Sequence, residues 1–124
     1  MNLVDSCGWL EYFADGPAAD FYAPALENTA RLLVPTSCLY EVFKRVLQQR
    51  GEDAAIGAVA VMQQGEIVEL DESVALTAAR LSHAMKLPMA DATILATAHL
   101  REATIWTQDT HFAGVEGVKF YIDK

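Results

Sequence analysis

The amino-acid sequence predicts an α/β protein, a three-layer α/β/α sandwich around a mostly parallel central sheet. Short apolar runs alternate with longer segments of helical periodicity along the whole chain. Strands that are separated by helices form parallel βαβ units, with helices on both faces of the sheet. Because the chain has no repeat, linker or low-complexity tract, we expect residues 1–124 to form one domain.

The chain begins with a short buried strand, expected over residues 2–5. A helix over residues 6–13 follows, and Ser6 is a suitable residue to cap its first turn. A glycine–proline pair then breaks the chain, and a second helix fits residues 18–28.

The next strand is expected over residues 31–35 and ends at a proline. It precedes a clear amphipathic helix that should end near Gly51. The apolar residues of this helix recur at i, i+3, i+4, i+7 and i+8, and they are Leu39, Val42, Phe43, Val46 and Leu47. Another helix, over residues 52–64, is rich in alanine and valine and stops at Gly65.

The second half of the chain supplies three more strands. They are expected at residues 66–70, within 103–109, and at 118–122. Asp71 is placed to cap a helix over residues 72–86, and a nearly all-apolar helix begins after Pro88. The alternation of strands and helices thus continues to the end of the chain.

Composition excludes several classes of protein. With 52% hydrophobic residues the chain is not expected to be disordered, and no apolar run is long enough to span a bilayer. The N-terminus has no signal-type pattern, so a cytoplasmic protein is expected. We therefore interpret Cys7 and Cys38 as free thiols of the core. The net charge of −8 argues against a broad basic surface for nucleic acid.

Four acidic residues occupy positions that the fold would bring to one edge of the sheet. Asp5 and Asp109 close predicted strands, and Glu41 lies in the second turn of the helix after the second strand. Asp91 opens the apolar helix before the fourth strand. Ligand sites of such folds lie outside the carboxyl ends of the strands. We therefore expect these four carboxylates to converge there.

Converging carboxylates repel one another unless cations neutralise them. An oxygen-only set of ligands suits Mg²⁺ or Mn²⁺, which hold phosphates and activate water for phosphodiester hydrolysis. Each acid also has an ordinary explanation. Asp5 and Asp109 suit turns or caps, Glu41 can pair with Lys44 and Arg45, and a first-turn acid such as Asp91 favours the helix dipole.

Histidine and basic residues add two further expectations. The three histidines, His83, His99 and His111, are widely spaced and are not expected to bind metal. Four basic residues can either line an RNA path beside the acids or form a solvated surface, namely Lys44, Arg45, Arg50 and Lys86.

Taken together, four segments resemble the PIN-domain ribonuclease family, specifically the VapC-type toxins of toxin–antitoxin pairs. In chain order they are VDSCGWLEYF, VPTSCLYEVFK, LPMADATILATA and IWTQDTHF. The resemblance covers essentially the whole chain. It implies a PIN-like α/β/α sandwich, one nuclease domain over residues 1–124, and a Mg²⁺- or Mn²⁺-dependent endoribonuclease that blocks translation or growth.

The resemblance also implies roles for individual residues. The acidic catalytic and metal site would consist of Asp5, Glu41, Asp91 and Asp109. Asp5 and Asp91 would bind the principal metal. Thr107, and with it Ser6, would support the site by hydrogen bonding. The RNA products would carry 5′-phosphate and 3′-hydroxyl ends.

The implied partners are an RNA substrate, an antitoxin protein and a second copy of the chain as a homodimer. Five aromatic residues crowd the first two predicted helices, and they are Trp9, Tyr12, Phe13, Phe21 and Tyr22. Two short helices would not easily bury all five, so we expect some of them to contact the antitoxin.

Two other readings of the sequence remain open. A receiver-like signalling domain is also small, acidic and doubly wound, and Asp71 follows the third strand where a phosphoacceptor would lie. However, it requires paired acids after the first strand, where Ser6 and Cys7 stand. The other reading is a PIN-fold binding protein without catalysis, against which the four intact acids argue.

Overall fold

The structure is a computed structural model, and it describes residues 1–122; residues 123 and 124 of the predicted domain lie outside this range. Five strands form one sheet in the order β3-β2-β1-β4-β5, and every pair of neighbours is parallel. The strands are β1 (Asn2–Val4), β2 (Leu32–Pro35), β3 (Glu66–Val68), β4 (Thr104–Thr107) and β5 (Val118–Phe120). In the register of the sheet, Leu3 of β1 pairs with Leu33 on one side and Ile105 on the other.

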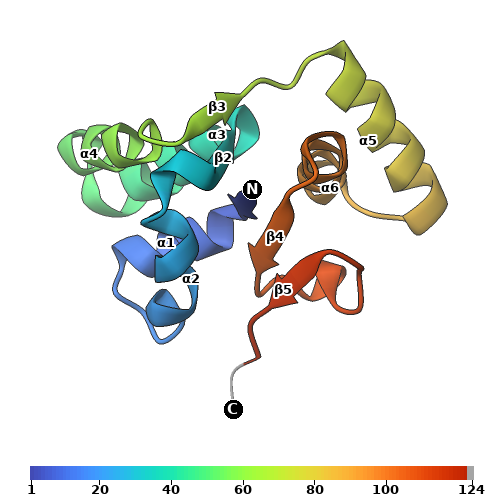
Figure 1. The fold of residues 1–124 in the computed structure, drawn as a ribbon. Helices are drawn as coiled ribbons and strands as arrows, with labels where there is room; N and C mark the ends of the chain where they lie inside the picture. The colour runs from blue at the N-terminus through green and yellow to red at the C-terminus, as the bar shows by residue number, and fades with distance from the viewer. Residues whose placement is uncertain (123–124) are drawn as a thin grey trace.

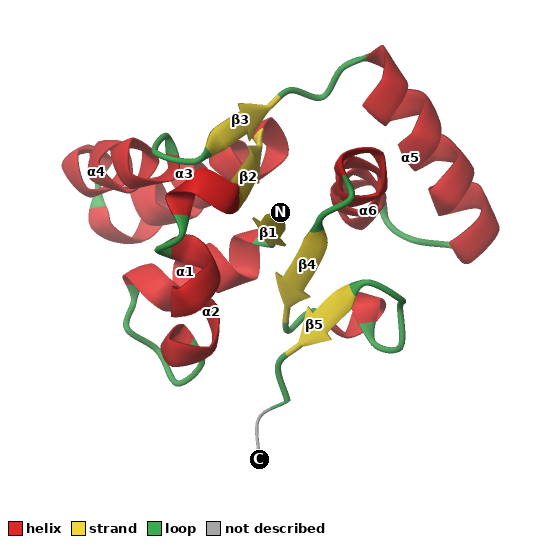
Figure 2. Ribbon diagram, viewed as in Figure 1, coloured by secondary structure: helices red, strands yellow, loops and turns green. Residues whose placement is uncertain are grey.

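Helices cover both faces of the sheet, as the sequence predicts. They are α1 (Ser6–Phe13), α2 (Ala19–Leu26), α3 (Thr36–Arg50), α4 (Glu52–Met62), α5 (Glu72–Met85) and α6 (Met89–Arg101). Figure 1 shows α1 to α4 on one side and α5 and α6 on the other, and Figure 2 shows the same three layers by element type. Among the described residues, no helix combines the length and apolarity needed to cross a bilayer.

The central strands are buried because helices cover both of their faces. All four residues of β2 are buried, and Leu3 and Val4 of β1 are fully so. Such strands are continuous apolar runs rather than alternating ones. On the α1 side the packing is close at Gly8, where a Cβ would lie 2.5 Å from Val4 Cγ1 and 2.6 Å from Tyr22 Cε1. Only a residue without a side chain allows α1, α2 and β1 to approach this closely.

The structure corrects several local expectations. The N-cap of α1 is Asp5, whose side chain accepts from the backbone N–H of Ser6, so Ser6 is not the cap. Arg31 ends a 3₁₀ turn (Thr29–Arg31) instead of beginning a strand. A second 3₁₀ turn, Thr110–Phe112, follows β4, and Asp109 caps it, which is the ordinary role that the sequence allows for this acid. The strands are also shorter than expected, because pairing stops where the chain turns toward each helix.

The receiver-like reading is wrong because the order of the strands differs. Receiver folds have the strand order 2-1-3-4-5, in which β1 lies between β2 and β3. Here β1 lies between β2 and β4, and β3 is at the edge. Asp71, the phosphoacceptor candidate, is an exposed N-cap whose Oδ1 accepts from Val74 N–H of α5 at 2.9 Å.

Candidate active site

The four predicted acids converge at the carboxyl edge of the sheet. Asp5 follows β1, Asp109 follows β4, and Glu41 and Asp91 project from α3 and from the first turn of α6. Their charges act on one another: Asp109 raises the pKa of Asp5, Asp5 raises the pKa of Glu41, and both Asp109 and Asp5 raise the pKa of Asp91. The elements of a parallel sheet therefore produce one acidic cluster from distant segments.

Asp5 is held rigidly by the structure around it. Its Oδ1 accepts from Ser6 N–H at 2.7 Å, which caps α1, and its Oδ2 accepts from the Thr107 hydroxyl at 3.0 Å. The residue is only 6% exposed. Burial raises the pKa of its carboxyl, while the hydrogen bonds from Thr107 and Ser6 act in the opposite direction. Both oxygens of this carboxylate thus have fixed directions.

Thr107 connects two of the acids. Besides donating to Asp5, its hydroxyl oxygen accepts from the backbone N–H of Asp109 at 3.0 Å. The side chain is completely buried at the end of β4. Thr107 therefore sets both the rotamer of Asp5 and the backbone direction of Asp109.

The two cysteines are free, and they differ in their surroundings. Cys38 is a fully buried residue of the first turn of α3, and it faces the core. The Cys7 sulfur lies 3.7 Å from Asp5 Oδ2 and 3.5 Å from Thr107 Oγ1, directly behind the acidic cluster. Burial, together with the Asp5 charge, raises the pKa of the Cys7 thiol. Cys7 is thus a neutral thiol of the polar layer that supports the site, a position that the sequence does not reveal.

Asp91 stands at the start of a buried helix. Every residue of α6 from Asp91 to Ala98 is buried, and Asp91 itself is 8% exposed. Burial, followed by the proximity of Asp109 and Asp5, raises the pKa of Asp91 to about 6. The apolar helix fixes the carboxylate at the edge of the sheet, where removal from water makes its charge costly.

Glu41 completes the cluster from α3. Its side chain is half-buried, and burial together with the Asp5 charge raises the pKa of its carboxyl. The Ser6 hydroxyl acts in the opposite direction. Ser6 therefore contacts two acids, with its backbone N–H on Asp5 and its side chain near Glu41.

One residue of the site was missed in the sequence. His111 lies on the 3₁₀ turn after β4, with Nδ1 2.6 Å from Asp91 Oδ2 and 3.1 Å from Asp109 Oδ1. The three side chains offer ligand atoms that all lie within 4.8 Å of one another. The sequence predicts no metal-binding histidine, yet His111 lies within ligand distance of two of the acids. The spacing Asp109-x-His111 beside a turn was the available signal.

The donor set of this cluster fits a divalent cation. Carboxylate oxygens predominate, and burial followed by neighbouring acidic charge raises the pKa values of Asp5, Glu41 and Asp91. A bound cation would offset both effects. Within residues 1–122, the set that meets close-range ligand spacing is Asp91, Asp109 and His111, with Asp5 and Glu41 farther out. Oxygen-rich sites of this kind hold Mg²⁺ or Mn²⁺.

The predicted aromatic contact surface is only partly exposed. Trp9 is 1% exposed and Tyr22 is 0% exposed, so these two belong to the core and leave the other three as candidates for a partner contact. Gly8 lets Tyr22 pack against α1, and the Tyr22 hydroxyl donates to Gln108 Oε1 at 3.0 Å. The other three aromatic residues are half-buried, and they are Tyr12, Phe13 and Phe21.

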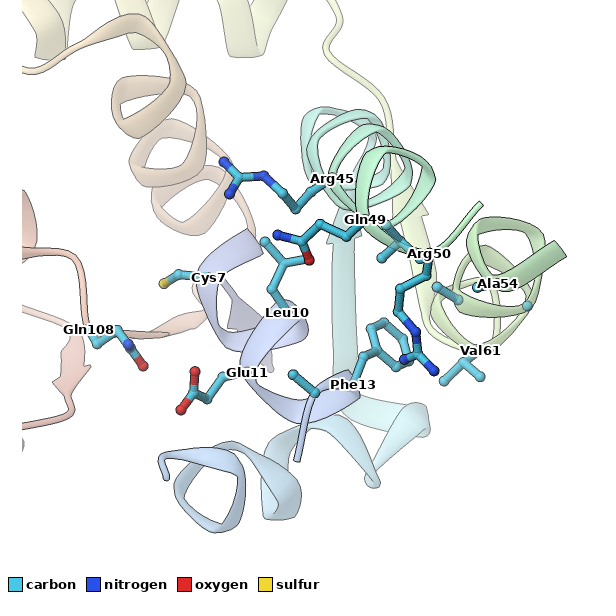
Figure 3. A pocket seen from close by; sticks show the side chains of 14 residues that line it. Cys7, Leu10, Glu11, Phe13, Arg45, Gln49, Arg50, Ala54, Val61 and Gln108 are labelled. Atoms are coloured by element: carbon cyan, nitrogen blue, oxygen red, sulfur yellow. The ribbon is translucent and has the colours of Figure 1, made fainter. Parts of the chain in front are cut away.

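A groove of about 600 Å³ leads away from the site between α1 and the α3–α4 pair. Figure 3 shows Cys7 and Gln108 at one end, and Arg45, Gln49 and Arg50 of α3 along one wall. Its remaining lining is mostly apolar and comes from α1, α3 and α4, for example Leu10, Phe13, Val46 and Val61. The groove thus combines an apolar floor with two guanidinium groups on its α3 wall.

The basic candidates occupy different places. Arg45 and Arg50 line the groove, whereas Lys44 lies with Nζ 5.7 Å from the centre of the Tyr40 ring. Lys86 is the exposed, left-handed residue that ends α5 and begins the connection to α6. The arginines are therefore the basic residues in the groove that reaches the site.

A profile of the PIN domain family matches residues 3–118. Similar solved structures include a toxin–antitoxin complex from Klebsiella pneumoniae, with 23% identity, 96% of both chains covered and a TM-score of 0.81. The VapC20 structure from Mycobacterium tuberculosis, described as a sarcin-ricin loop cleaving toxin, has 16% identity and covers 94% of this chain and 95% of its own, with a TM-score of 0.77.

DNA-bound VapBC from Salmonella typhimurium has 14% identity and a TM-score of 0.76, with 98% of both chains covered. A search of curated proteins found no match. At these identities, the similar structures establish the shared fold. The family profile covers almost all residues from β1 to β5.

Proposed function

Because this chain belongs to the PIN domain family, we propose that it is a metal-dependent endoribonuclease and the toxin of a toxin–antitoxin pair. The observation that carries the proposal is the convergence of four carboxylates at the carboxyl edge of a parallel sheet. A fold alone does not imply an activity. A cluster of mutually repelling acids that the fold holds together does call for a cationic partner.

The proposed cofactor is Mg²⁺ or Mn²⁺. When bound, such a cation supplies an activated water and stabilises charge on the scissile phosphate. In our proposal Asp5 and Asp91 hold it, and Glu41 and Asp109 complete the site directly or through waters. Thr107 and Ser6 orient Asp5 by hydrogen bonds of 3.0 Å and 2.7 Å, and this preorganisation suits a ligand that must not move during the reaction.

The proposed substrate is RNA, cleaved to leave 5′-phosphate and 3′-hydroxyl ends. Arg45 and Arg50 support a substrate path, because they bring positive charge to the groove that Cys7 and Gln108 also line, in a chain whose net charge is −8. Lys44 and Lys86 are exposed and would add longer-range attraction. With so few cations, we expect recognition to depend on RNA shape and single-stranded loops.

The proposed partner is an antitoxin in the cytoplasm. The similar structures from Klebsiella and Salmonella are complexes of this type. In this chain, the groove beside α1 has the apolar floor that a helix or strand of a partner requires. Half-buried Phe13 of α1 lines the groove. The other half-buried aromatic residues are Tyr12 on α1 and Phe21 on α2. A homodimer, or a dimer of toxin–antitoxin pairs, belongs to the same proposal.

The test is RNA cleavage by the purified full chain, with and without EDTA, and with Mg²⁺ or Mn²⁺ restored. Asp91→Asn should abolish metal-dependent cleavage and keep a native circular dichroism spectrum. Asp20→Asn is the matched control, because Asp20 is also an acid in the first turn of a helix. Undiminished cleavage by Asp91→Asn would reveal a contaminating nuclease or a different site.

A PIN-fold binding protein without catalysis remains the second candidate. It would bind RNA or a protein partner yet leave RNA intact when metal is present. The four acids at one edge of the sheet favour catalysis over this alternative.

A further inference from the structure

His111 lies on a well-fixed turn and points its imidazole at the acidic cluster. Its backbone N–H donates to Asp109 Oδ1 at 2.9 Å, and the next residue, Phe112, is completely buried. This hydrogen bond and the burial of Phe112 fix the turn on which His111 lies. The imidazole itself is about half exposed, with 54% of its side chain accessible, so burial does not explain why it faces the acids.

The distances around Nδ1 match those between neighbouring ligands of one ion. Ligands at right angles on an octahedral ion, each bound at about 2.1 Å, lie about 3 Å apart. Nδ1 of His111 lies 2.6 Å from Asp91 Oδ2 and 3.1 Å from Asp109 Oδ1. In its neutral form an imidazole offers one ring nitrogen as a metal ligand.

We propose that Nδ1 of His111 is a ligand of the same divalent cation, beside Asp91 and Asp109. This inference rests on the proposed metal-dependent function and adds a nitrogen donor to its oxygen ligands. Imidazole binds transition metals better than it binds Mg²⁺. The site of this chain therefore prefers Mn²⁺ or another transition metal to Mg²⁺, and His111 is the origin of that preference.

The alternative is an ordinary ion pair, in which a protonated His111 donates to the two carboxylates and leaves when a metal arrives. The two arrangements use the same atoms. They differ in whether a nitrogen is bonded to the metal in the loaded protein, which a spectroscopic measurement can decide without any assay of activity.

The experiment is pulsed electron paramagnetic resonance of Mn²⁺ bound to the full chain, prepared without a histidine tag. A coordinated imidazole gives modulation from a directly bonded ¹⁴N. We expect this signal in the wild type, its loss in His111→Gln, and its retention in His99→Gln. His99 lies in the last turn of the helix whose first turn holds Asp91, about 12 Å along the axis.

Calorimetry on the same three proteins provides a second readout. His111→Gln should weaken Mn²⁺ binding by about tenfold or more and Mg²⁺ binding by less, whereas His99→Gln should change neither. Stoichiometric Mn²⁺ without a nitrogen signal would overturn the inference but leave the proposed nuclease intact. Failure of the wild type to bind any divalent cation would overturn both.

Discussion

Removing the charge of Asp91 should stabilise the metal-free protein, although it destroys the proposed site. The pKa of this carboxyl rises from 3.8 to about 6 in the folded protein, chiefly through burial. In an unfolded chain the group ionises near 3.8. As the pH increases from 4 to 7, the unfolded state therefore loses its proton first, and folding is penalised.

The size of this penalty follows from the shift. About two pKa units, at 1.36 kcal/mol each, correspond to about 3 kcal/mol before screening. Because water and His111 reach the carboxylate, we reduce this to about 1–2 kcal/mol. Asp91→Asn keeps the shape and removes the charge. We therefore expect the variant to be more stable than the wild type by that amount at pH 7 in EDTA.

The assay is urea unfolding in EDTA at pH 4 and pH 7, followed by circular dichroism. The gain of Asp91→Asn should be present at pH 7 and should nearly vanish at pH 4, where the wild-type carboxyl is protonated in the folded state. Asp20→Asn, the control in the first turn of α2, should lose a few tenths of a kcal/mol through the helix dipole.

Saturating Mn²⁺ should reverse the order of stability. A ligand that binds only the folded state stabilises it by about 2.7 kcal/mol at a hundred times its dissociation constant. The wild type should gain this free energy of unfolding when Mn²⁺ is added, and Asp91→Asn should not. If Asp91→Asn is less stable than the wild type in EDTA at pH 7, the ionised carboxylate does not destabilise the folded protein. The argument from its burial and from the neighbouring acids is then wrong.

Three further predictions concern single residues around the site. Gly8→Ala should lower the free energy of unfolding by about 1–3 kcal/mol in urea titrations, because its Cβ would lie 2.5 Å from Val4 Cγ1; an unchanged midpoint would mean that α1 shifts freely. Thr107→Val should reduce Mn²⁺ affinity by about tenfold or more in calorimetry while the far-ultraviolet spectrum stays native; equal affinity would remove Thr107 from the support of the site. Arg45→Ala should weaken RNA binding in filter assays and reduce the slope of log affinity against log salt concentration by about one, the value for one phosphate contact. An unchanged slope would mean that RNA does not contact Arg45.

Much of the site was predictable because parallel topology gathers the carboxyl ends of strands. That rule placed Asp5 and Asp109 directly, and it placed Glu41 through the helix that follows β2. Asp91 was less certain, since α6 follows another helix. It reaches the same edge because α6 leads directly into β4 and so begins at the carboxyl end of the strands.

The remaining details depend mostly on tertiary contacts, which a local pattern hints at but does not determine. The ring of His111 reaches the acids only because a 3₁₀ turn reverses the chain after β4. Burial of Trp9 and Tyr22 depends on the close approach of two helices at Gly8. The cap of α1 was assigned one residue late, because Ser6 and Asp5 are both good capping residues and only the backbone geometry separates them.

The double use of Asp5 matters to anyone who needs a disarmed form of this protein. One of its oxygens ends the backbone of α1 and the other receives Thr107, so the same carboxylate belongs to the scaffold and to the site. Replacing it removes a helix cap together with a candidate ligand, and an inert phenotype would then have two explanations. Asp91, whose charge the scaffold only tolerates, is the cleaner choice for a silent variant in toxicity assays or crystallisation with RNA.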